Sequence, residues 1–382
     1  MMQGVHNWRP FVYEQDWIST TFGKSKALTN ATGVGDKWLT SMNDAAASLD
    51  MTIQYSMSFT PAILQSSKLQ AVTQIRGSGD YTVGGSQWRI GLTSMYYWAL
   101  GVVASKDTLW TTESQPGCPK AGSFNCTEPN LAIQMINAVL SGGPVGPGDR
   151  VNMTDATMTM RSCDGNGRLL RGDRPHAPLD LAFASALDSA ATQADPEGGR
   201  VLTLWSSYTN HSSRYHYVFS TDAADVYPKD LLLATADTTQ EYLAVTIAET
   251  PSDGTSWGAA DATVQTVSAT APLKLAPSLA AGRGGKPGVV PFTYTLLAPV
   301  IDGQKVVMLG EMDKVAPASS HRFEQTGTND WALTGAASET VVVSFAAVSA
   351  AGQAEAAKTV SCVLSAAGKG KLSCAADACT CV

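Results

Sequence analysis

The hydrophobic positions in the first half of the chain follow two alternating patterns. Runs typical of strands occupy residues 11–13, 51–57, 70–76 and 107–112. Apolar residues with helical spacing occupy residues 36–49, 60–67, 88–103 and 128–141, and the stretch from the first strand to about residue 36 is expected to be a loop. Because strands that alternate with helices are typical of crossover units, this half predicts a parallel sheet.

The pattern changes from about residue 165. Short strand-like runs separated by Gly, Asp and Pro turns occupy residues 202–206, 215–219, 242–247, 291–297, 305–309 and 340–345. Helical periodicity is absent here, which predicts one or two antiparallel β-sandwiches. The Ala- and Gly-rich stretches 260–288 and 345–372 are expected to be surface loops or a soft tail. We therefore predict an α/β region over residues 1–165 and an all-β region over residues 166–382.

The composition excludes several classes of protein. Of 382 residues, 44% are hydrophobic and only 15% are charged, which favours packed domains over disorder. The net charge of −7 and the absence of a Lys/Arg cluster argue against a nucleic-acid partner. No apolar run approaches the roughly 18 residues that a bilayer requires, so no membrane span is predicted.

The seven cysteines bear on the compartment. Cys118 and Cys126 bracket a loop that a disulfide can close, and four more cysteines crowd the C-terminus: Cys362, Cys374, Cys379 and Cys381. Their spacing favours disulfides over zinc. Four N-x-S/T sequons also favour a secreted or lumenal route: Asn30, Asn125, Asn152 and Asn210. The N-terminus lacks an apolar signal core, so the chain is either cytosolic or starts upstream of Met1.

Two acidic residues follow predicted parallel strands. Asp16 ends the sequence YEQD, and Asp80 follows the strand that ends near Arg76. The carboxyl ends of parallel strands meet at one edge, where two carboxylates can divide glycosidic chemistry between a nucleophile and a proton donor. A retaining mechanism places the two groups about 5–5.5 Å apart. The alternative is that these acids cap helices or pair with surface arginines.

The order of four motifs resembles the glycoside hydrolase clan that holds the α-galactosidases and the raffinose synthases. The motifs are YEQD, the R-x-x-x-D segment from Arg76 to Asp80, SGGPVGPGD at 141–149 and DGNGRLLRGDRP at 164–175. The resemblance implies the C-terminal portion, about five strands, of a (β/α)8-type TIM barrel followed by a β-sandwich. It also implies that Asp16 is the nucleophile, Asp80 the acid/base and Arg76 a sugar contact. The substrate would be an oligosaccharide or glycoside, with no cofactor and no metal.

Two features depart from the clan's pattern. Glu14 stands where α-galactosidases generally carry a Lys, which puts galactose specificity in doubt. The first three strand–helix units have no counterpart before Phe11, so an N-terminal truncation is expected. The alternatives to a retaining α-glycosidase are therefore a catalytically inactive carbohydrate-binding relative and a raffinose synthase-like glycosyltransferase.

Several other side chains are candidates for sugar contact. Gln54 and Tyr55 end the second predicted strand and are candidates to line the subsite, although Tyr55 can equally pack in the core. Trp17, Trp88 and Trp110 can stack on sugar rings, with core packing as the alternative. Asp107 and Glu113 flank the next predicted strand and are further candidates to bind a substrate. A turn is expected at Asp149, and a charged, solvated face is expected from Arg161, Asp164, Arg168 and Asp173.

Overall fold

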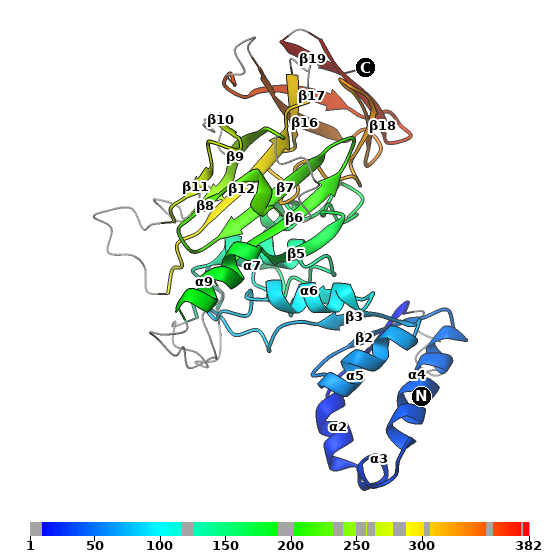
Figure 1. Ribbon diagram of the computed structural model, residues 1–382. Coiled ribbons are helices and arrows are strands. Elements are labelled where there is room, and N and C mark those ends of the chain that lie inside the picture. The colour runs from blue at the N-terminus through cyan, green and yellow to red at the C-terminus, as the bar shows by residue number, and fades with distance from the viewer. Residues whose placement is uncertain are drawn as a thin grey trace.

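The computed structural model describes most of the chain. The described residues are 10–116, 126–189, 202–231, 240–249, 257, 264–277, 288–301, 306–348, 354–375 and 377–381. They form a mixed structure with one parallel sheet, several antiparallel sheets and short helices. Helices α2–α5 lie at the opposite end of the molecule from the C-terminal strands (Figure 1).

The N-terminal half contains a four-stranded parallel sheet, as predicted. Its strands, in spatial order, are β1 (Val12–Gln15), β2 (Thr52–Tyr55), β3 (Val72–Arg76) and β4 (Val103–Ser105). A parallel bridge between Ala104 and Gly142 adds a fifth segment beside β4. Five parallel segments therefore follow one another in chain order, and helices connect them.

The helices differ in part from the prediction. They are α2 (Ile18–Lys24), α3 (Lys26–Asn30), α4 (Val34–Ala47), α5 (Thr60–Gln65), the 3₁₀ turn η1 (Ser66–Lys68), α6 (Gly91–Ala99), α7 (Leu131–Leu140), α8 (Ala156–Met160) and α9 (Asp180–Ser189). The loop expected up to about residue 36 is wrong, because α2 and α3 occupy it. Trp17 adopts a left-handed conformation with φ 56°, and the next residue, Ile18, is fully buried. The burial of Ile18 stabilises α2, although the polar sequence of this helix does not predict it.

The helix predicted over 88–103 is shorter, and the strand predicted over 107–112 is wrong. The helix α6 ends at Ala99, and Gly101 reverses the chain with φ 82°, which glycine adopts without strain. The next strand then starts at Val103. Within the predicted strand, Leu109 makes only an isolated bridge with Pro147.

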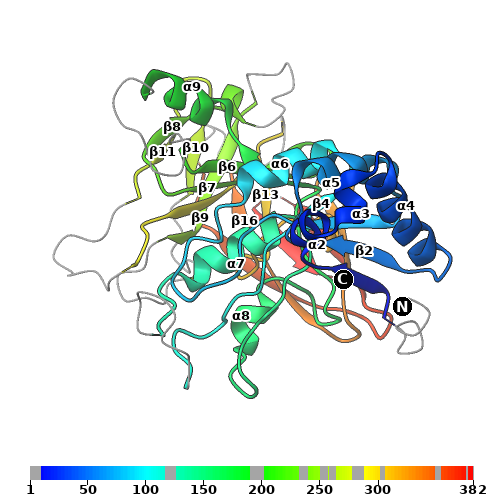
Figure 2. The same cartoon turned by 90° about the horizontal axis from the view of Figure 1, so that it is seen from below.

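The parallel sheet has one apolar and one polar face. Ile53, Tyr55 and Ile75 pack in a buried cluster with Leu39 and Met42 of α4. Figure 2 shows α2–α5 gathered on one side of β2. Because successive side chains of a strand point to opposite faces, the residues between these apolar positions face away from the helices. They are mostly polar: Glu14, Gln54, Gln74, Arg76 and Ser105.

The second half is mostly antiparallel, as predicted. The largest sheet has the order β10-β9-β12-β7-β6-β5. Its strands are β5 (Arg174–Pro178), β6 (Leu204–Asn210), β7 (Arg214–Ser220), β9 (Tyr242–Glu249), β10 (Val264–Val267) and β12 (Thr293–Pro299). Helical periodicity was predicted to be absent, but α9 lies between β5 and β6, and its Ala182 and the preceding Leu179 pack against one face of this sheet.

Three smaller antiparallel sheets complete the structure. They contain β8 (Ala224–Val226) with β11 (Leu273–Leu275), β13 (Val306–Gly310) with β16 (Thr340–Ala347) and β17 (Lys358–Val363), and β14 (Phe323–Gly327) with β15 (Asp330–Thr334), β18 (Lys369–Ala375) and β19 (Ala378–Cys381). A 3₁₀ turn, η2 (Pro228–Asp230), follows β8. The soft tail expected over 345–372 is wrong, because β17 and β18 lie there and pair in regular ladders.

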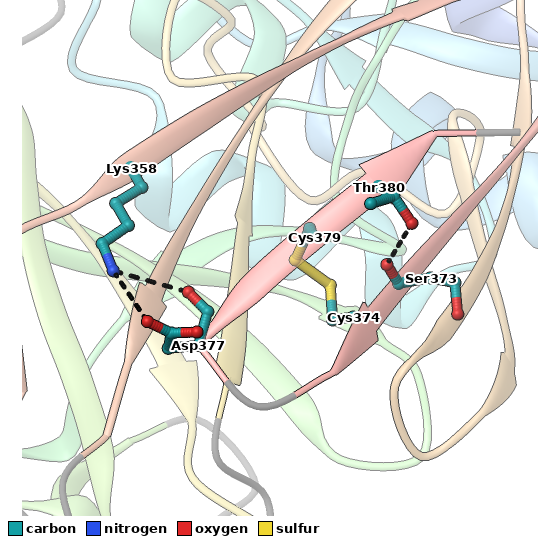
Figure 3. The surroundings of a disulfide bond; sticks show 6 residues. All are labelled: Lys358, Ser373, Cys374, Asp377, Cys379 and Thr380. Carbon is teal, nitrogen blue, oxygen red and sulfur yellow. Dashed lines mark hydrogen bonds and ion pairs between the residues drawn. A yellow bond between two sulfur atoms is a disulfide. The ribbon is translucent and has the colours of Figure 1, made fainter.

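Two disulfides close the C-terminal sheets. Cys362 of β17 bonds to Cys381 of β19, and Cys374 bonds to Cys379 across the β18–β19 pair (Figure 3). The disulfide interpretation of these four cysteines is therefore confirmed. Cys126 is also disulfide-bonded, whereas Cys118, its expected partner, lies outside the described residues.

The largest apolar core crosses the predicted boundary at residue 165. Trp88, Ile133 and Val139 from the first half belong to the same buried cluster as Phe219 and Leu296 from the antiparallel sheet. Helix α6 also contacts β5 (Figure 1). The two halves thus share buried surface. Among the described helices, none is both long and apolar enough to cross a membrane.

Candidate functional site

The candidate site lies at the carboxyl edge of the parallel sheet. Asp16 directly follows β1 and is partly buried. Its Oδ1 accepts a hydrogen bond from the Trp17 N–H at 2.8 Å, while Gln15 Nε2 donates to the Asp16 backbone oxygen. By strand alternation the Asp16 side chain belongs to the polar face. One carboxylate oxygen is thus engaged locally.

Asp80 lies on the loop after β3, beside Arg76. The Arg76 Nη2 atom lies 2.7 Å from Asp80 Oδ1, and Arg76 Nη1 lies 3.8 Å from Asp107 Oδ1. The Arg76 side chain is 11% exposed, whereas Asp80 is 65% exposed. The arginine is therefore held in the sheet edge between two carboxylates, and the Asp80 carboxylate remains accessible to solvent.

Asp16 and Asp80 belong to strands separated by one neighbour, β2. Two strand spacings put the backbones of β1 and β3 roughly 10 Å apart. The side chains have to lean toward each other to reach the 5–5.5 Å of a retaining pair.

Glu14 and Gln54 lie together on the polar face. Gln54 Nε2 donates to Glu14 Oε1 at 3.3 Å across the β1–β2 pair, and the two residues are register partners. Glu14 is exposed and two residues before Asp16, so its carboxylate adds negative charge on the same face. These two polar side chains extend the candidate site along the sheet.

Tyr55 lies on the opposite face. It is fully buried among the apolar residues that pack against α4, and burial raises the pKa of its phenol to about 12. Its hydroxyl has no hydrogen-bond partner among the described residues. Tyr55 therefore packs in the core, which was one of the two predictions for it. It lies on the opposite face of the sheet from Asp16.

The candidate tryptophans are in different environments. Trp88 is fully buried, with ring centroids 6.3 Å from Trp205 and 6.1 Å from Phe219, and Trp110 is 9% exposed. A fully enclosed ring presents no face to a sugar in this structure. Trp88 is therefore a core residue, which was the alternative to sugar stacking. Trp17 is 54% exposed and directly follows Asp16, which makes it the aromatic ring nearest in sequence to that acid.

Sequence reasoning missed a buried polar network beside Asp80. The Tyr81 N–H donates to Asp107 Oδ2 at 2.6 Å, and the Tyr81 hydroxyl donates to Glu128 Oε2 at 2.7 Å. The buried Lys106 ammonium lies 4.8 Å from the Tyr81 ring centroid and donates to the Thr108 carbonyl at 2.7 Å. Burial lowers the pKa of Lys106 to about 8. Lys106 directly follows β4 and precedes Asp107, but no sequence signal connects it with Glu128.

Asp149 holds the adjoining loops. Its carboxylate accepts hydrogen bonds from the Thr111 N–H, the Thr111 hydroxyl and Gln115 Nε2. Asp149 therefore joins two loops at the same edge of the sheet, rather than only closing a local turn. The Glu128 N–H donates to the Glu113 backbone carbonyl at 2.7 Å, which ties the same loop to the segment just before α7.

The comparisons add no family. No protein-family model matches the chain, and no curated protein matches it. Within the described residues, no group of three or more His, Cys, Asp or Glu side chains is arranged to hold a metal ion. The functional argument therefore rests on the residues at the sheet edge.

Proposed function

We propose that this protein is a retaining α-glycosidase in which Asp16 is the nucleophile and Asp80 the general acid/base. The observation that supports the proposal is the two-sided sheet: Asp16, Gln54 and Arg76 share the face opposite the helices. Arg76 in turn holds Asp80 at the same edge. Acidic side chains at the carboxyl ends of parallel strands are where barrel enzymes place their chemistry.

The proposed reaction has two steps. Asp16 attacks the anomeric carbon while Asp80 gives its proton to the departing glycosidic oxygen, which leaves as an alcohol. The resulting glycosyl ester at Asp16 is then attacked by a water that transfers its proton to Asp80. The ester bond breaks, the sugar leaves and both acids return to their starting states. The chemistry requires only the two carboxylates.

Arg76 has two tasks in this proposal. Its guanidinium orients the exposed Asp80 carboxylate, and a planar donor group can also bind sugar hydroxyls. Glu14 and Gln54 supply hydroxyl acceptors and donors farther along the same face. The substrate class that fits these groups is an uncharged oligosaccharide or glycoside.

For the fold, we propose that residues 1–165 form part of a (β/α)8-type barrel and that residues 166–382 form the accessory β-sandwich region. The five parallel segments in chain order support the first assignment. The polar face would then line the barrel interior at its carboxyl end. The antiparallel sheets support the second assignment.

The decisive experiment compares single substitutions on aryl α-glycosides. Asp16→Asn should abolish turnover. Asp80→Asn should remove activity on substrates with poor leaving groups, because these need a proton from the general acid. Activated aryl substrates should keep part of their activity. Asp50→Asn is the control, because Asp50 is an exposed acid in a left-handed turn that Asn also tolerates, before β2. Retained turnover in Asp16→Asn would overturn the assignment.

A non-catalytic carbohydrate-binding protein is the second candidate. The observation that favours it is the separation of roughly 10 Å between the strands of Asp16 and Asp80. Calorimetric titration with oligosaccharides distinguishes the two: binding without turnover in the wild-type protein supports this candidate. A third outcome, transfer of the sugar to an acceptor sugar instead of water, would indicate a raffinose synthase-like glycosyltransferase.

A further inference from the structure

A cavity opens beside β4 of the parallel sheet. It has a volume of about 350 Å³ and lies beside Val103, the first residue of β4. The lining residues come from β4, the Gly142–Pro144 segment, the loop after α8 and the turn before β14: Val103, Gly142, Gly143, Pro144, Arg168, Leu169, Arg171 and His321. Four segments of the chain thus build one cavity.

The polar lining of this cavity is basic. Arg168, Arg171 and His321 contribute side chains, and no Asp or Glu lines the cavity. The whole chain carries a net charge of −7, so two arginines without an acidic residue in the same lining run against its overall charge. A concave surface with uncompensated cations attracts anions and concentrates them locally.

The loop fixes Arg168 without using its guanidinium. Asp164 is 2% exposed, and its Oδ1 accepts the N–H groups of Asn166 and Arg168, each at 2.9 Å. The Arg168 carbonyl in turn accepts the Asp164 N–H at 3.0 Å. Asp164, the acid nearest to Arg168 in the sequence, therefore binds backbone N–H groups of the turn. Among the described residues, no ion pair or hydrogen bond engages the exposed Arg168 guanidinium.

Arg171 is held deeper in the wall. Its Nη1 donates to the Gly142 carbonyl, which fixes the side chain against the sheet. Burial lowers the pKa of Arg171, and the nearby Asp173 only partly opposes this effect. Asp173 itself accepts hydrogen bonds from the Ser320 hydroxyl and the Asn210 N–H. A bound anion would therefore stabilise the positive charge of the partly buried Arg171.

His321 completes the polar wall. Its Nδ1 lies 2.8 Å from the Leu169 carbonyl oxygen, so the backbone fixes the ring and the Nδ1–H as donor. The remaining nitrogen, Nε2, makes no hydrogen bond with another described residue. The rest of the lining is apolar and comes from Val103, Pro144 and Leu169.

We propose that this cavity binds a small organic anion, whose carboxylate or phosphate oxygens bind Arg168 and Arg171. Planar guanidinium groups recognise both oxyanions through paired N–H donors, so the shared chemistry is the oxyanion. The apolar wall accepts the carbon part of the ligand. The lining includes none of the residues of the proposed catalytic edge, although Val103 lies only two residues before Ser105, the partner of Arg76, in β4.

The test titrates the full chain with phenyl phosphate, benzoate and phenol by calorimetry. Phenol is the neutral control, because it carries the same ring without the oxyanion. Binding of phenyl phosphate or benzoate, together with no binding of phenol, is the expected result, and the preferred anion identifies the oxyanion that the site takes. No heat from either anion at millimolar concentration would overturn the proposal.

Two variants locate the binding. Arg168→Gln should weaken anion binding about tenfold, the loss of one charge-assisted hydrogen bond, and should fold normally because its guanidinium holds nothing in place. Lys37→Gln removes one exposed charge on α4 and should bind like the wild type. Equal affinity in Arg168→Gln and the wild type would overturn the proposal. Neither variant touches Asp16 or Asp80, so failure here leaves the glycosidase assays unaffected.

Discussion

The guanidinium of Arg76 lies 2.7 Å from the carboxylate of Asp80, four residues farther along the chain. Asp80 is 65% exposed, and an ion pair with such an exposed partner contributes only about 0–1 kcal/mol to stability. The pair fixes the orientation of an accessible acid at the edge of the sheet. Its effect should therefore be seen in activity more than in unfolding.

Replacing Arg76 tests this role. Arg76→Lys keeps the charge but loses the paired donors, so the proposed glycosidase activity should fall roughly ten- to hundredfold in kcat/KM. Steady-state assays on an aryl α-glycoside measure the effect, and urea unfolding measures stability in parallel. Lys358→Gln is the control, because Lys358 of β17 forms an exposed pair with Asp377 among the C-terminal strands, far from the site. Unchanged kcat/KM in Arg76→Lys would contradict the positioning role.

The buried triad around Arg322 should be a strong determinant of stability. Arg322 is 1% exposed and donates to Glu311 at 2.6 Å and to Glu339 at 2.7 Å. Burial raises the pKa of Glu311 to about 7, and the arginine opposes this shift. Arg322→Met leaves two carboxylates without their cation and should lower the free energy of unfolding by about 3–5 kcal/mol.

Urea unfolding at neutral pH measures the effect of Arg322→Met. The control is Lys371→Met, because Lys371 lies 3.7 Å from Asp330 with both side chains well exposed. That substitution should change the free energy of unfolding by no more than about 0.5 kcal/mol. Equal effects of the two substitutions would show that the buried triad adds nothing beyond a surface pair.

Two buried histidines should make the protein less stable in mild acid. Burial lowers the pKa of His176 and that of His216, each to about 3. Both are therefore neutral in the folded state, whereas the unfolded chain protonates them below pH about 6.5. Because the unfolded state binds more protons, the stabilising contribution is complete above that pH and is lost as the pH falls from about 6.5 toward 3.

Unfolding by urea at several pH values between 5 and 7 measures this dependence. His176→Phe fills the same space against Trp205, where the ring centroids lie 5.0 Å apart, and removes one titrating group. The free energy of unfolding should depend less steeply on pH in His176→Phe than in the wild type. The difference between the two slopes should be up to about 1.4 kcal/mol per pH unit. Identical slopes would contradict a neutral buried His176.

The two C-terminal disulfides should stabilise the chain unequally. Cys362 and Cys381 are 19 residues apart in the sequence, whereas Cys374 and Cys379 are five residues apart. Closing the longer loop removes more entropy from the unfolded chain, so its loss should cost about 3 kcal/mol against about 2 kcal/mol for the shorter one. Thermal unfolding of the two double Cys→Ala variants compares them, and the reverse order would contradict the loop-length argument.

Strands were predictable where the residues alternate or form compact apolar runs. The segments that became β2 and β3 were predicted within a few residues, and Pro61 marked the start of α5. Helices α2 and α3 were not, because their sequence is polar and their stability depends on the burial of Ile18. The β17–β18 region was mistaken for a tail, since β18 is ordered by pairing with β15, which is distant in the sequence.

The candidate site was predictable to the same extent. Pairing with an arginine was the alternative to a catalytic role for Asp80, and the structure contains an ion pair between Arg76 and Asp80. The hydrogen bond between Tyr81 and Glu128 joins residues 47 positions apart, so no local pattern points to it. The face of the sheet on which Tyr55 lies depends on the register with β1 and on where α4 packs. The sequence therefore left both a sugar contact and core packing open for Tyr55.

The two-sided parallel sheet also limits how this chain can change in length. A single residue inserted between Val12 and Tyr13, with Val12 still paired to Thr52, would turn Asp16 toward the helices and Tyr13 toward the polar face, because each step along a strand reverses the side chain. The apolar cluster and the candidate acid would be lost together. Insertions and deletions should therefore be tolerated in the connection between α2 and α4, and excluded from the strand that carries the acid.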